Sequence, residues 1–571
     1  MFVAFYFVKG GFMPNCRQAA LDNAYREVIL PFRGSTEELL ERFGADCIVS
    51  ITEGISIAYF QIPEGFSYEL ELDYSMIPKC YGLLQTAAEQ ANSTQIQSNP
   101  NLQFYGQGIL LGFVDTGISY EHPAFSYEDG STRIVSIWDQ SVQSGTAPVG
   151  FAFGSEYTRE QIEEALRSGA PKELVPSEDT IGHGTAMAGA AAGRQTRDGS
   201  FEGVAPLADI AMVKLKEAKP YLREYYQIAE GIPCYAESDI LLGVKYLYEL
   251  AIARRQPLVL CIGVGTNAGS HKGLLPLSLY LNQIAATLEN CVVVAGGNEG
   301  NRGHHFSGRA EGTAYTEVEL LVGEEKRGLY VELWGTGESI FTMELVAPNG
   351  EVIPRLPSRI FYRYRYNLYY AGGAVSVEYR LLERRSGQMT ISLRFEQPMQ
   401  GVWRFRVYEA YGGSGTFDLW LPMEVFLSEE TYFLRPDPAV TICEPGNAGV
   451  VITTGTYAYV SSSLYLYSSR GYSADGRVKP ELAAPGVDVL VPSGSNAYVE
   501  ATGSSIGAAI TAGSCALVLE SSIENDIAAV STQEVKRLLT GGARRMDIIY
   551  PNNEWGYGML DVNAAFNLFR R

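Results

Sequence analysis

Four continuous apolar runs constrain the fold of this 571-residue chain more than any other feature. They span residues 109–114, 210–215, 258–262 and 292–295. Runs without polar alternation are typical of strands that are buried on both faces of a parallel sheet. Helical patterns follow His183 and Ser238, between these runs. The sequence therefore predicts an α/β fold, in which ligands bind near the carboxyl ends of the strands.

Three short motifs carry the residue types of one acyl-transfer site. They are Val-Asp-Thr-Gly around Asp115, Gly-His-Gly-Thr around His183 and Gly-Ser-Ser-Ile-Gly-Ala-Ala around Ser505. A serine hydroxyl becomes a nucleophile when a base lies within hydrogen-bond reach and a third group orients that base. We predict Ser505 as nucleophile, His183 as general base and Asp115 as the orienting carboxylate.

Acyl transfer also needs donors for the oxygen that becomes negatively charged in the transition state. Residues 291–300 form an apolar strand pattern that runs into two glycines and Asn298. The side chain of Asn298 is the candidate donor, and the backbone N–H of Ser505 is the second. Ser505 opens a small-residue helical stretch, and the positive end of a helix favours the developing charge.

These motifs resemble those of the subtilisin-like serine proteases. Further landmarks stand in family order: Gly203-Val204-Ala205-Pro206, the segment 479–486, and 555–562. Gly263, Val264 and Gly265 match the segment that lines the family's pocket for the residue before the scissile bond. The resemblance covers about 108–308 and 446 to the C-terminus. Ser504 replaces the family's usual threonine and Ala509 its usual proline. Together with the retained N-terminal segment and a long insertion, both changes are similar to the Csp germination proteases of spore-forming clostridia.

The chain divides into four predicted regions: 1–98, 99–308, 309–445 and 446–571. The first contains a strand at 28–32, a capping box at Ser35 that opens a helix ending at Gly44, and a hairpin of 47–51 and 55–62. This α+β module with its polar linker, 91–103, is similar to a subtilisin propeptide. The second and fourth regions form the predicted subtilisin-like α/β domain.

Residues 309–445 change to short alternating stretches separated by turn residues, such as 328–334, 342–347, 389–395 and 402–408. This pattern predicts an inserted β-sandwich of jelly-roll type. Csp-type proteases are similar in carrying a jelly roll at this place.

The resemblance implies a serine endopeptidase that acts on a protein or peptide and needs no cofactor. It also implies that the N-terminal module lies in the cleft until self-cleavage, which we expect between about Lys79 and Ser98. A permanently docked regulatory domain is the alternative. The Csp resemblance adds a physiological substrate, the zymogen of a spore-cortex lytic enzyme. A general intracellular or secreted subtilase is the alternative. A non-catalytic sensor or scaffold is the competing class of protein.

Composition excludes some partners. A net charge of −21 argues against nucleic acid, which needs a basic surface. No run approaches the roughly 20 apolar residues of a membrane span, and no signal peptide is predicted. We expect synthesis in the cytoplasm, and the Csp resemblance adds packaging in the spore; Met13 is an alternative start. The eight cysteines are expected to be reduced core residues.

Several other features are explained by ordinary structural roles, which we favour over binding or metal sites. The stretch 361–366 alternates aromatic residues with arginines; a strand with two faces explains it better than a binding platform for sugar or single-stranded nucleic acid. His304 and His305 lack a second pair at ligand spacing, so a solvated loop is expected and no metal site. His122 is expected in a loop, and Asp139 and Asp179 as solvated carboxylates.

Overall fold

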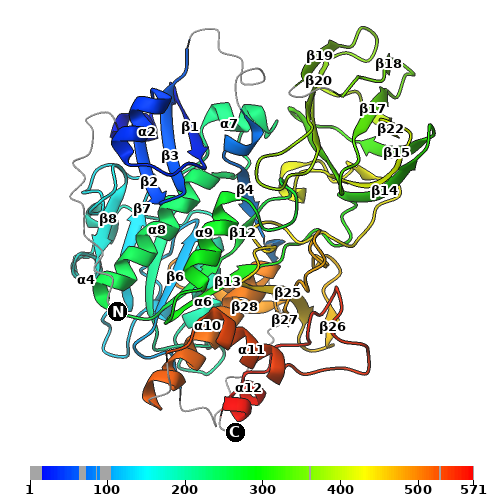
Figure 1. Cartoon of the computed structure of the whole chain (residues 1–571). Coiled ribbons are helices and arrows are strands. Elements are labelled where there is room, and N and C mark those ends of the chain that lie inside the picture. The colour runs from blue at the N-terminus through cyan, green and yellow to red at the C-terminus, as the bar shows by residue number, and fades with distance from the viewer. Residues whose placement is uncertain are drawn as a thin grey trace.

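The computed structural model describes residues 16–63, 73–84, 86–89, 104–358, 362–525 and 529–569. Its centre is a nine-stranded, largely parallel sheet in the order β26-β25-β13-β11-β6-β9-β7-β8, with β27 also paired to β25 (Figure 1). The strands are β6 (Leu110–Asp115), β7 (Ile134–Asp139), β8 (Ser155–Thr158), β9 (Asp209–Lys214), β11 (Leu258–Ile262), β13 (Asn290–Ala295), β25 (Ile452–Ala458), β26 (Ser463–Leu464) and β27 (Leu482–Pro485). The four apolar runs of the sequence lie in four adjacent parallel strands, which confirms the predicted α/β class.

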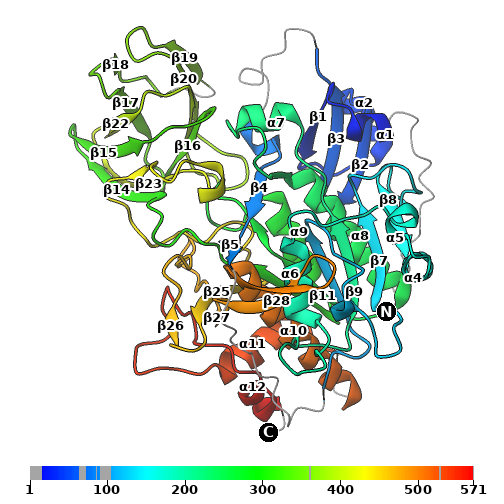
Figure 2. The same ribbon diagram turned by 180° about the vertical axis from the view of Figure 1, so that it is seen from behind.

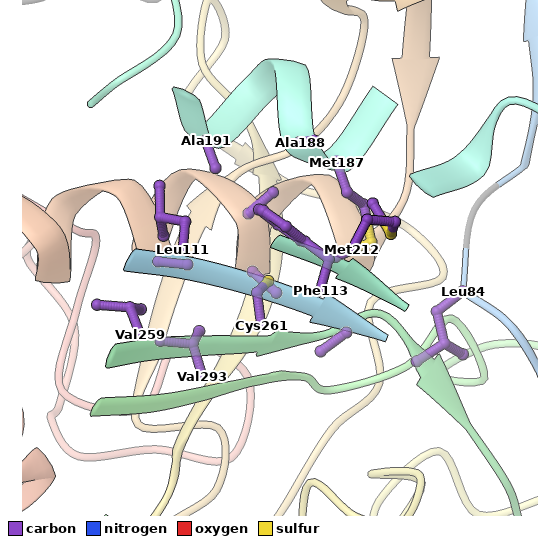
Figure 3. Packing of buried hydrophobic residues seen from close by; sticks show 14 of the residues in the cluster. Leu84, Leu111, Phe113, Met187, Ala188, Ala191, Met212, Val259, Cys261 and Val293 are labelled. Carbon is purple, nitrogen blue, oxygen red and sulfur yellow. The ribbon is translucent and has the colours of Figure 1, made fainter. Parts of the chain in front are cut away.

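Helices cover both faces of this sheet because side chains alternate along each buried strand. On β6, Leu111 and Phe113 belong to the same buried cluster as the small residues of α6 and α10 (Figure 3). Leu110 and Val114 point to the opposite face, against α8 and α9. The helices of this domain are α4 (Arg159–Arg167), α5 (Pro171–Leu174), α6 (His183–Ala192), α7 (Pro220–Tyr225), α8 (Glu237–Arg254), α9 (Pro276–Ala285), α10 (Ser504–Glu524), α11 (Thr532–Gly542) and α12 (Val562–Phe569).

Helix α10 is long and apolar enough to cross a membrane by length and composition alone. However, 94% of its apolar window is buried inside the protein, as in the core helix of a globular domain. It is the one such helix among the described residues.

The insert is a β-sandwich beside the sheet domain (Figures 1 and 2). Its two sheets run β14-β23-β16-β21-β20-β19 and β18-β17-β22-β15-β24. Trp403, Phe405 and Val407 all point from β22 into the shared core, as their spacing predicted. The strands are β14 (His305–Glu311), β15 (Tyr315–Val322), β16 (Gly328–Gly335), β17 (Phe341–Val346), β18 (Val352–Ile353), β19 (Tyr362–Asn367), β20 (Ala374–Arg380), β21 (Thr390–Glu396), β22 (Gly401–Glu409), β23 (Ser414–Trp420) and β24 (Tyr432–Phe433).

The N-terminal module is a three-stranded sheet with two helices. Strands β1 (Tyr25–Leu30), β2 (Cys47–Thr52) and β3 (Ile55–Gln61) pair in the order β1-β3-β2, with α1 (Cys16–Leu21) and α2 (Thr36–Phe43) beside them. At the start of α2, Ser35 and Glu38 form the predicted capping box, and Gly44 ends the helix with φ +63°. The module packs on the catalytic domain through a buried ion pair in which Lys219 Nζ lies 3.0 Å from Glu27 Oε1.

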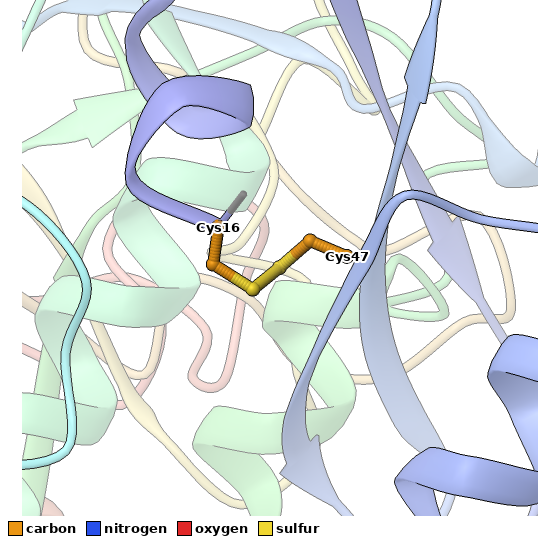
Figure 4. Close-up of a disulfide and its surroundings, with 2 residues drawn as sticks. All are labelled: Cys16 and Cys47. Carbon is orange, nitrogen blue, oxygen red and sulfur yellow. A yellow bond between two sulfur atoms is a disulfide. The ribbon is translucent and has the colours of Figure 1, made fainter. Parts of the chain in front are cut away.

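One cysteine prediction is wrong. Cys16 of α1 and Cys47 of β2 form a disulfide, because the helix lies against the start of that strand (Figure 4). The six other cysteines are buried and free, as expected.

Beyond the module, the chain runs through the 3-10 helix η1 (Tyr74–Met76) into β4 (Cys80–Leu83) and then β5 (Thr86–Glu89). Figure 1 shows β4 between the sheet domain and the β-sandwich. Strand β5 pairs with β29 (Ala497–Thr502), which pairs with β28 (Val489–Ser493). The predicted linker, 91–103, lies outside the described residues.

Candidate active site

Asp115, His183 and Ser505 come from three elements that end or begin at one edge of the central sheet. Asp115 is the last residue of β6, His183 the first residue of α6, and Ser505 lies in the first turn of α10. The structure brings the three side chains together. The Nδ1 atom of His183 lies 2.6 Å from Asp115 Oδ1, and its Nε2 atom lies 3.1 Å from Ser505 Oγ.

The imidazole is held in place by the start of α6. Asp179 caps this helix, since its Oδ2 atom accepts hydrogen bonds from the Thr185 N–H at 2.9 Å and the Thr185 hydroxyl at 2.6 Å. Gly184 allows α6 to approach β6 closely, because a Cβ there would lie 2.2 Å from the carbonyl oxygen of Gly117. The same loop orients Asp115, whose Oδ1 atom also accepts the N–H of Thr116 at 2.7 Å.

Asn298 follows β13 and lies against the start of α10. Its side-chain oxygen accepts the N–H of Ser504 at 3.0 Å, which fixes the plane of the amide group. The Ser504 hydroxyl accepts the N–H of Gly297 at 3.1 Å. Ser504 therefore ties the asparagine loop to the helix that carries Ser505, a contact that the sequence alone did not indicate.

The segment Gly263, Val264 and Gly265 borders a strand of the N-terminal region. Strand β12 (Val264–Gly265) pairs antiparallel with β4, whose other edge pairs with β10 (Tyr235–Ala236). The Leu84 N–H donates to the Gly263 carbonyl at 3.3 Å. A Cβ at Gly265 would lie 3.0 Å from Leu84 Cδ1, so the glycine makes room for this leucine. The chain thus lies in the site as an extended strand, held on both edges.

The carbonyl group of Leu84 lies beside Ser505. Its oxygen accepts the backbone N–H of Ser505 at 3.3 Å. This is the donor that the sequence indicated for the oxyanion, and the group that it meets is a peptide carbonyl. Because the strand covers the site, Asp115, His183 and Ser505 are only 1%, 3% and 0% exposed.

A model of the subtilase family matches residues 106–319 and 435–558, more than half of the chain. The chain belongs to the subtilase family. The solved structure of the Clostridium perfringens CspB protease is similar, with 28% identity, a TM-score of 0.74, and coverage of 83% of this chain and 95% of that one. This likeness confirms the predicted resemblance to Csp proteases.

Two curated subtilases match shorter stretches. Serine protease AprX of Bacillus subtilis is 30% identical over 144 residues, 22% of this chain and 31% of AprX. Subtilisin-like protease SBT1.9 of Arabidopsis thaliana is 29% identical over 123 residues, 19% of this chain and 17% of that protein. The chain therefore spans less than a third of each of these two relatives.

In this subtilase, a buried glutamate supports the segment that directly follows β12. Glu444 exchanges backbone hydrogen bonds with Thr266, directly after Gly265. Its carboxylate accepts the N–H of Gly273 and the hydroxyl of Ser278, both at 2.8 Å. Burial raises the pKa of Glu444 to about 7, because the charged form loses its hydration there. Burial and the nearby Asp115 charge also raise the pKa of the Cys261 thiol beneath the site.

Several polar residues that we expected in solvent are buried instead. His304 Nδ1 lies 2.5 Å from Glu299 Oε2, and His305 Nε2 lies 3.1 Å from Asp418 Oδ1, so neither histidine lies in a solvated loop. His305 is the first residue of β14, where it pairs with Trp420 of β23 and stacks on its ring, and both histidines are buried there. No cluster of three or more metal-ligating side chains occurs in the part of the chain that the structure describes.

Three further polar residues are also buried by tertiary packing. His122 caps a short 3-10 helix, η2 (Pro123–Phe125), and contacts the Ala497 carbonyl at 3.0 Å. Asp139 accepts the Ser177 hydroxyl at 2.8 Å. Asp179, the cap of α6, is 7% exposed, so the expectation of solvated carboxylates is wrong for both.

The tyrosine and arginine stretch forms the edge strand β19, except for Phe361, which lies outside the described residues. Tyr364 and Tyr366 pack against the sandwich core. Arg363 pairs with Glu378 of the neighbouring strand, with Nε 3.0 Å from Oε2. A strand with a tyrosine face and an arginine face accounts for this pattern.

Proposed function

We propose that this subtilase is a serine endopeptidase in which Ser505 attacks a peptide carbonyl. His183 Nε2 takes the hydroxyl proton and returns it to the leaving amine, while Asp115 holds Nδ1–H and stabilises the imidazolium. The Ser505 N–H and the amide of Asn298 hold the oxyanion. Water then hydrolyses the acyl-enzyme by the same proton route, so the residues of this chain suffice for every step.

The observation that carries the proposal is the carbonyl oxygen of Leu84, which lies 3.3 Å from the Ser505 nitrogen beside an aligned aspartate, histidine and serine. A peptide carbonyl in hydrogen-bond contact with the donor of the oxyanion is the geometry that hydrolysis requires. An antiparallel strand between β10 and β12 is also the way in which a substrate polypeptide would bind.

The same observation supports self-cleavage after Leu84. Attack on this carbonyl would break the bond between Leu84 and Gln85 and release an N-terminal fragment, residues 1–84. Gln85 lies outside the described residues. The bond falls within the expected range, 79–98, and Lys79, directly before β4, is itself buried.

Comparison of wild-type protein with Ser505→Ala tests both proposals. The wild type should yield two fragments, the larger beginning Gln-Thr-Ala-Ala at residue 85, whereas Ser505→Ala should stay intact. The exposed serine variant Ser461→Ala should be processed like the wild type. Identical chains from wild type and Ser505→Ala would refute self-cleavage, and a fragment beginning elsewhere would refute the assignment of the bond. Failure of the processed wild type to hydrolyse any peptide would favour the sensor or scaffold.

The similarity to CspB protease supports a narrower proposal, that the processed enzyme acts in the spore and activates the zymogen of a spore-cortex lytic enzyme. Incubation of that purified zymogen with the processed wild type should give a shortened, active lytic enzyme, and Ser505→Ala should leave it unchanged. A zymogen that stays intact while test peptides are cleaved would refute this role and leave the peptidase proposal standing.

A further inference from the structure

Gly82 in β4 lies against the 3-10 helix η3 (Glu424–Phe426), which is near the end of the insert and is called the wall below. A Cβ on Gly82 would lie 2.6 Å from Val425 Cγ2 and 3.0 Å from Phe426 Cζ. Ordinary carbon contacts are about 3.5–4.0 Å, so even a methyl group does not fit.

Glycine is required at position 82 by the lack of room for a side chain, and not by the backbone conformation. Gly82 is absent from the glycines with positive φ among the described residues, so its extended conformation is open to other amino acids. Strand β4 is held in register, with Gly82 opposite Gly265 and Leu83 opposite Val264. A larger residue would have to displace either the strand or η3.

The wall is anchored to the catalytic domain. The Glu424 N–H donates to Glu299 Oε1 at 3.0 Å, and the Glu424 carboxylate lies 2.6 Å from Arg302 Nη2. Glu299 directly follows Asn298 and is buried. Val425 is β-branched and has little rotamer freedom with which to yield. The end of the insert is thus tied to the loop of the proposed oxyanion donor.

The register relates this wall to the scissile bond. Counting back from the carbonyl that meets Ser505, the residues are Leu84, Leu83 and Gly82. We propose that Val425 and Phe426 determine specificity by admitting glycine as the third residue before the cleaved bond, both in the chain's own N-terminal segment and in protein substrates. This inference rests on the proposed peptidase function and names its substrates as extended segments with glycine at that position.

Fluorogenic peptides test the inference in trans. The processed enzyme is assayed with acetyl-Tyr-Gly-Leu-Leu linked to aminomethylcoumarin, which copies residues 81–84, and with peptides that carry alanine or valine in place of glycine. Overpacking of this kind should lower kcat/KM for the alanine peptide by at least about 10-fold, and more for valine. In Val425→Ala the ratio of glycine to alanine peptide should fall below about 3, because Cγ2 is gone. The exposed Val352→Ala variant should keep the wild-type ratio.

The rate of self-cleavage tests the requirement for glycine at position 82 in the chain's own N-terminal segment. Gly82→Ala should slow processing by at least about 10-fold, and Val425→Ala in the same chain should restore most of the rate. The peptide ratios provide an independent answer if Gly82→Ala does not fold. A wild-type ratio of glycine to alanine peptide near 1 overturns the inference while peptide hydrolysis upholds the peptidase. Absence of processing and of hydrolysis in the wild type overturns the peptidase proposal itself, and the inference with it.

Discussion

Replacement of Glu332 tests whether a single carboxylate oxygen joins three parts of the molecule. Glu332 lies in β16 of the sandwich and is 2% exposed. Its Oε2 atom accepts three hydrogen bonds, each of 2.9 Å: from the Tyr74 hydroxyl of η1, from Trp334 Nε1 within the sandwich, and from the Gly269 N–H of the catalytic domain. In Glu332→Ala all three buried donors lose their acceptor.

The magnitude follows from these three bonds. A buried donor left without a partner costs about 1–3 kcal/mol, so the loss of the acceptor for three donors in Glu332→Ala should lower the free energy of unfolding by about 3–9 kcal/mol. Tyr74→Phe removes one donor and leaves the carboxylate two, so it should cost about 1–2 kcal/mol. The exposed Glu338→Ala should change stability by less than about 0.5 kcal/mol.

Urea unfolding in the Ser505→Ala background, where we expect the chain to stay uncut, provides the assay. Tryptophan fluorescence is the signal, because Trp334 itself donates a hydrogen bond to Glu332. A multidomain chain need not unfold in one step, so the midpoint and slope of that first transition are compared among variants. A loss below about 1 kcal/mol in Glu332→Ala would refute the view that this carboxylate joins the three parts.

Three further predictions concern catalysis, pH and the disulfide. Asn298→Ala should slow self-cleavage on the order of 10² to 10³-fold, the loss known for the oxyanion asparagine of subtilisin, measured as the half-time of fragment appearance; an unchanged rate would contradict its role. Because burial raises the pKa of Glu444 to about 7 from 4.5, the folded state holds a proton between these values that the unfolded state releases, and stability falls as pH rises through this window. Relative to Glu444→Gln, which cannot titrate, the free energy of unfolding of the wild type, measured in urea, should fall by up to about 3 kcal/mol between about pH 5 and about pH 8. If the free energies of unfolding of both proteins depend on pH in the same way, this effect is excluded. Cys47→Ser should destabilise the N-terminal module by about 3–4 kcal/mol, since the disulfide to Cys16 closes a loop of 31 residues, and hydrogen exchange in β1 to β3 that matches the wild type would count against it.

Much of the fold was predictable because its signals are local. Buried parallel strands show as unbroken apolar runs, the start of α2 as a serine with glutamate three residues later, and the core face of β22 as alternate large residues. The residue types of the site were equally visible. Asp115, His183 and Ser505 each lie in a short motif beside glycine at the end or the beginning of an element, where a side chain can face a cleft.

The predictions that failed concern burial and pairing between distant segments. Cys16 and Cys47 are 31 residues apart, and nothing in their neighbours indicates that a helix will lie against that strand. His304 and His305 have a polar loop sequence, yet Glu299 and Asp418 pair with them in the interior. Local sequence reports local preference, whereas burial depends on which other elements pack nearby.

By itself, the amino-acid sequence determined an α/β protein of the subtilase type, with an N-terminal module, an inserted β-sandwich and three chemically matched residues in family order. Only the tertiary structure decided that the carbonyl of Leu84 meets the Ser505 N–H, and that Val425 and Phe426 lie over Gly82. These contacts join segments more than 300 residues apart along the chain. Their geometry depends on how whole elements pack, because a residue's neighbours in sequence constrain its backbone but not its distant partners.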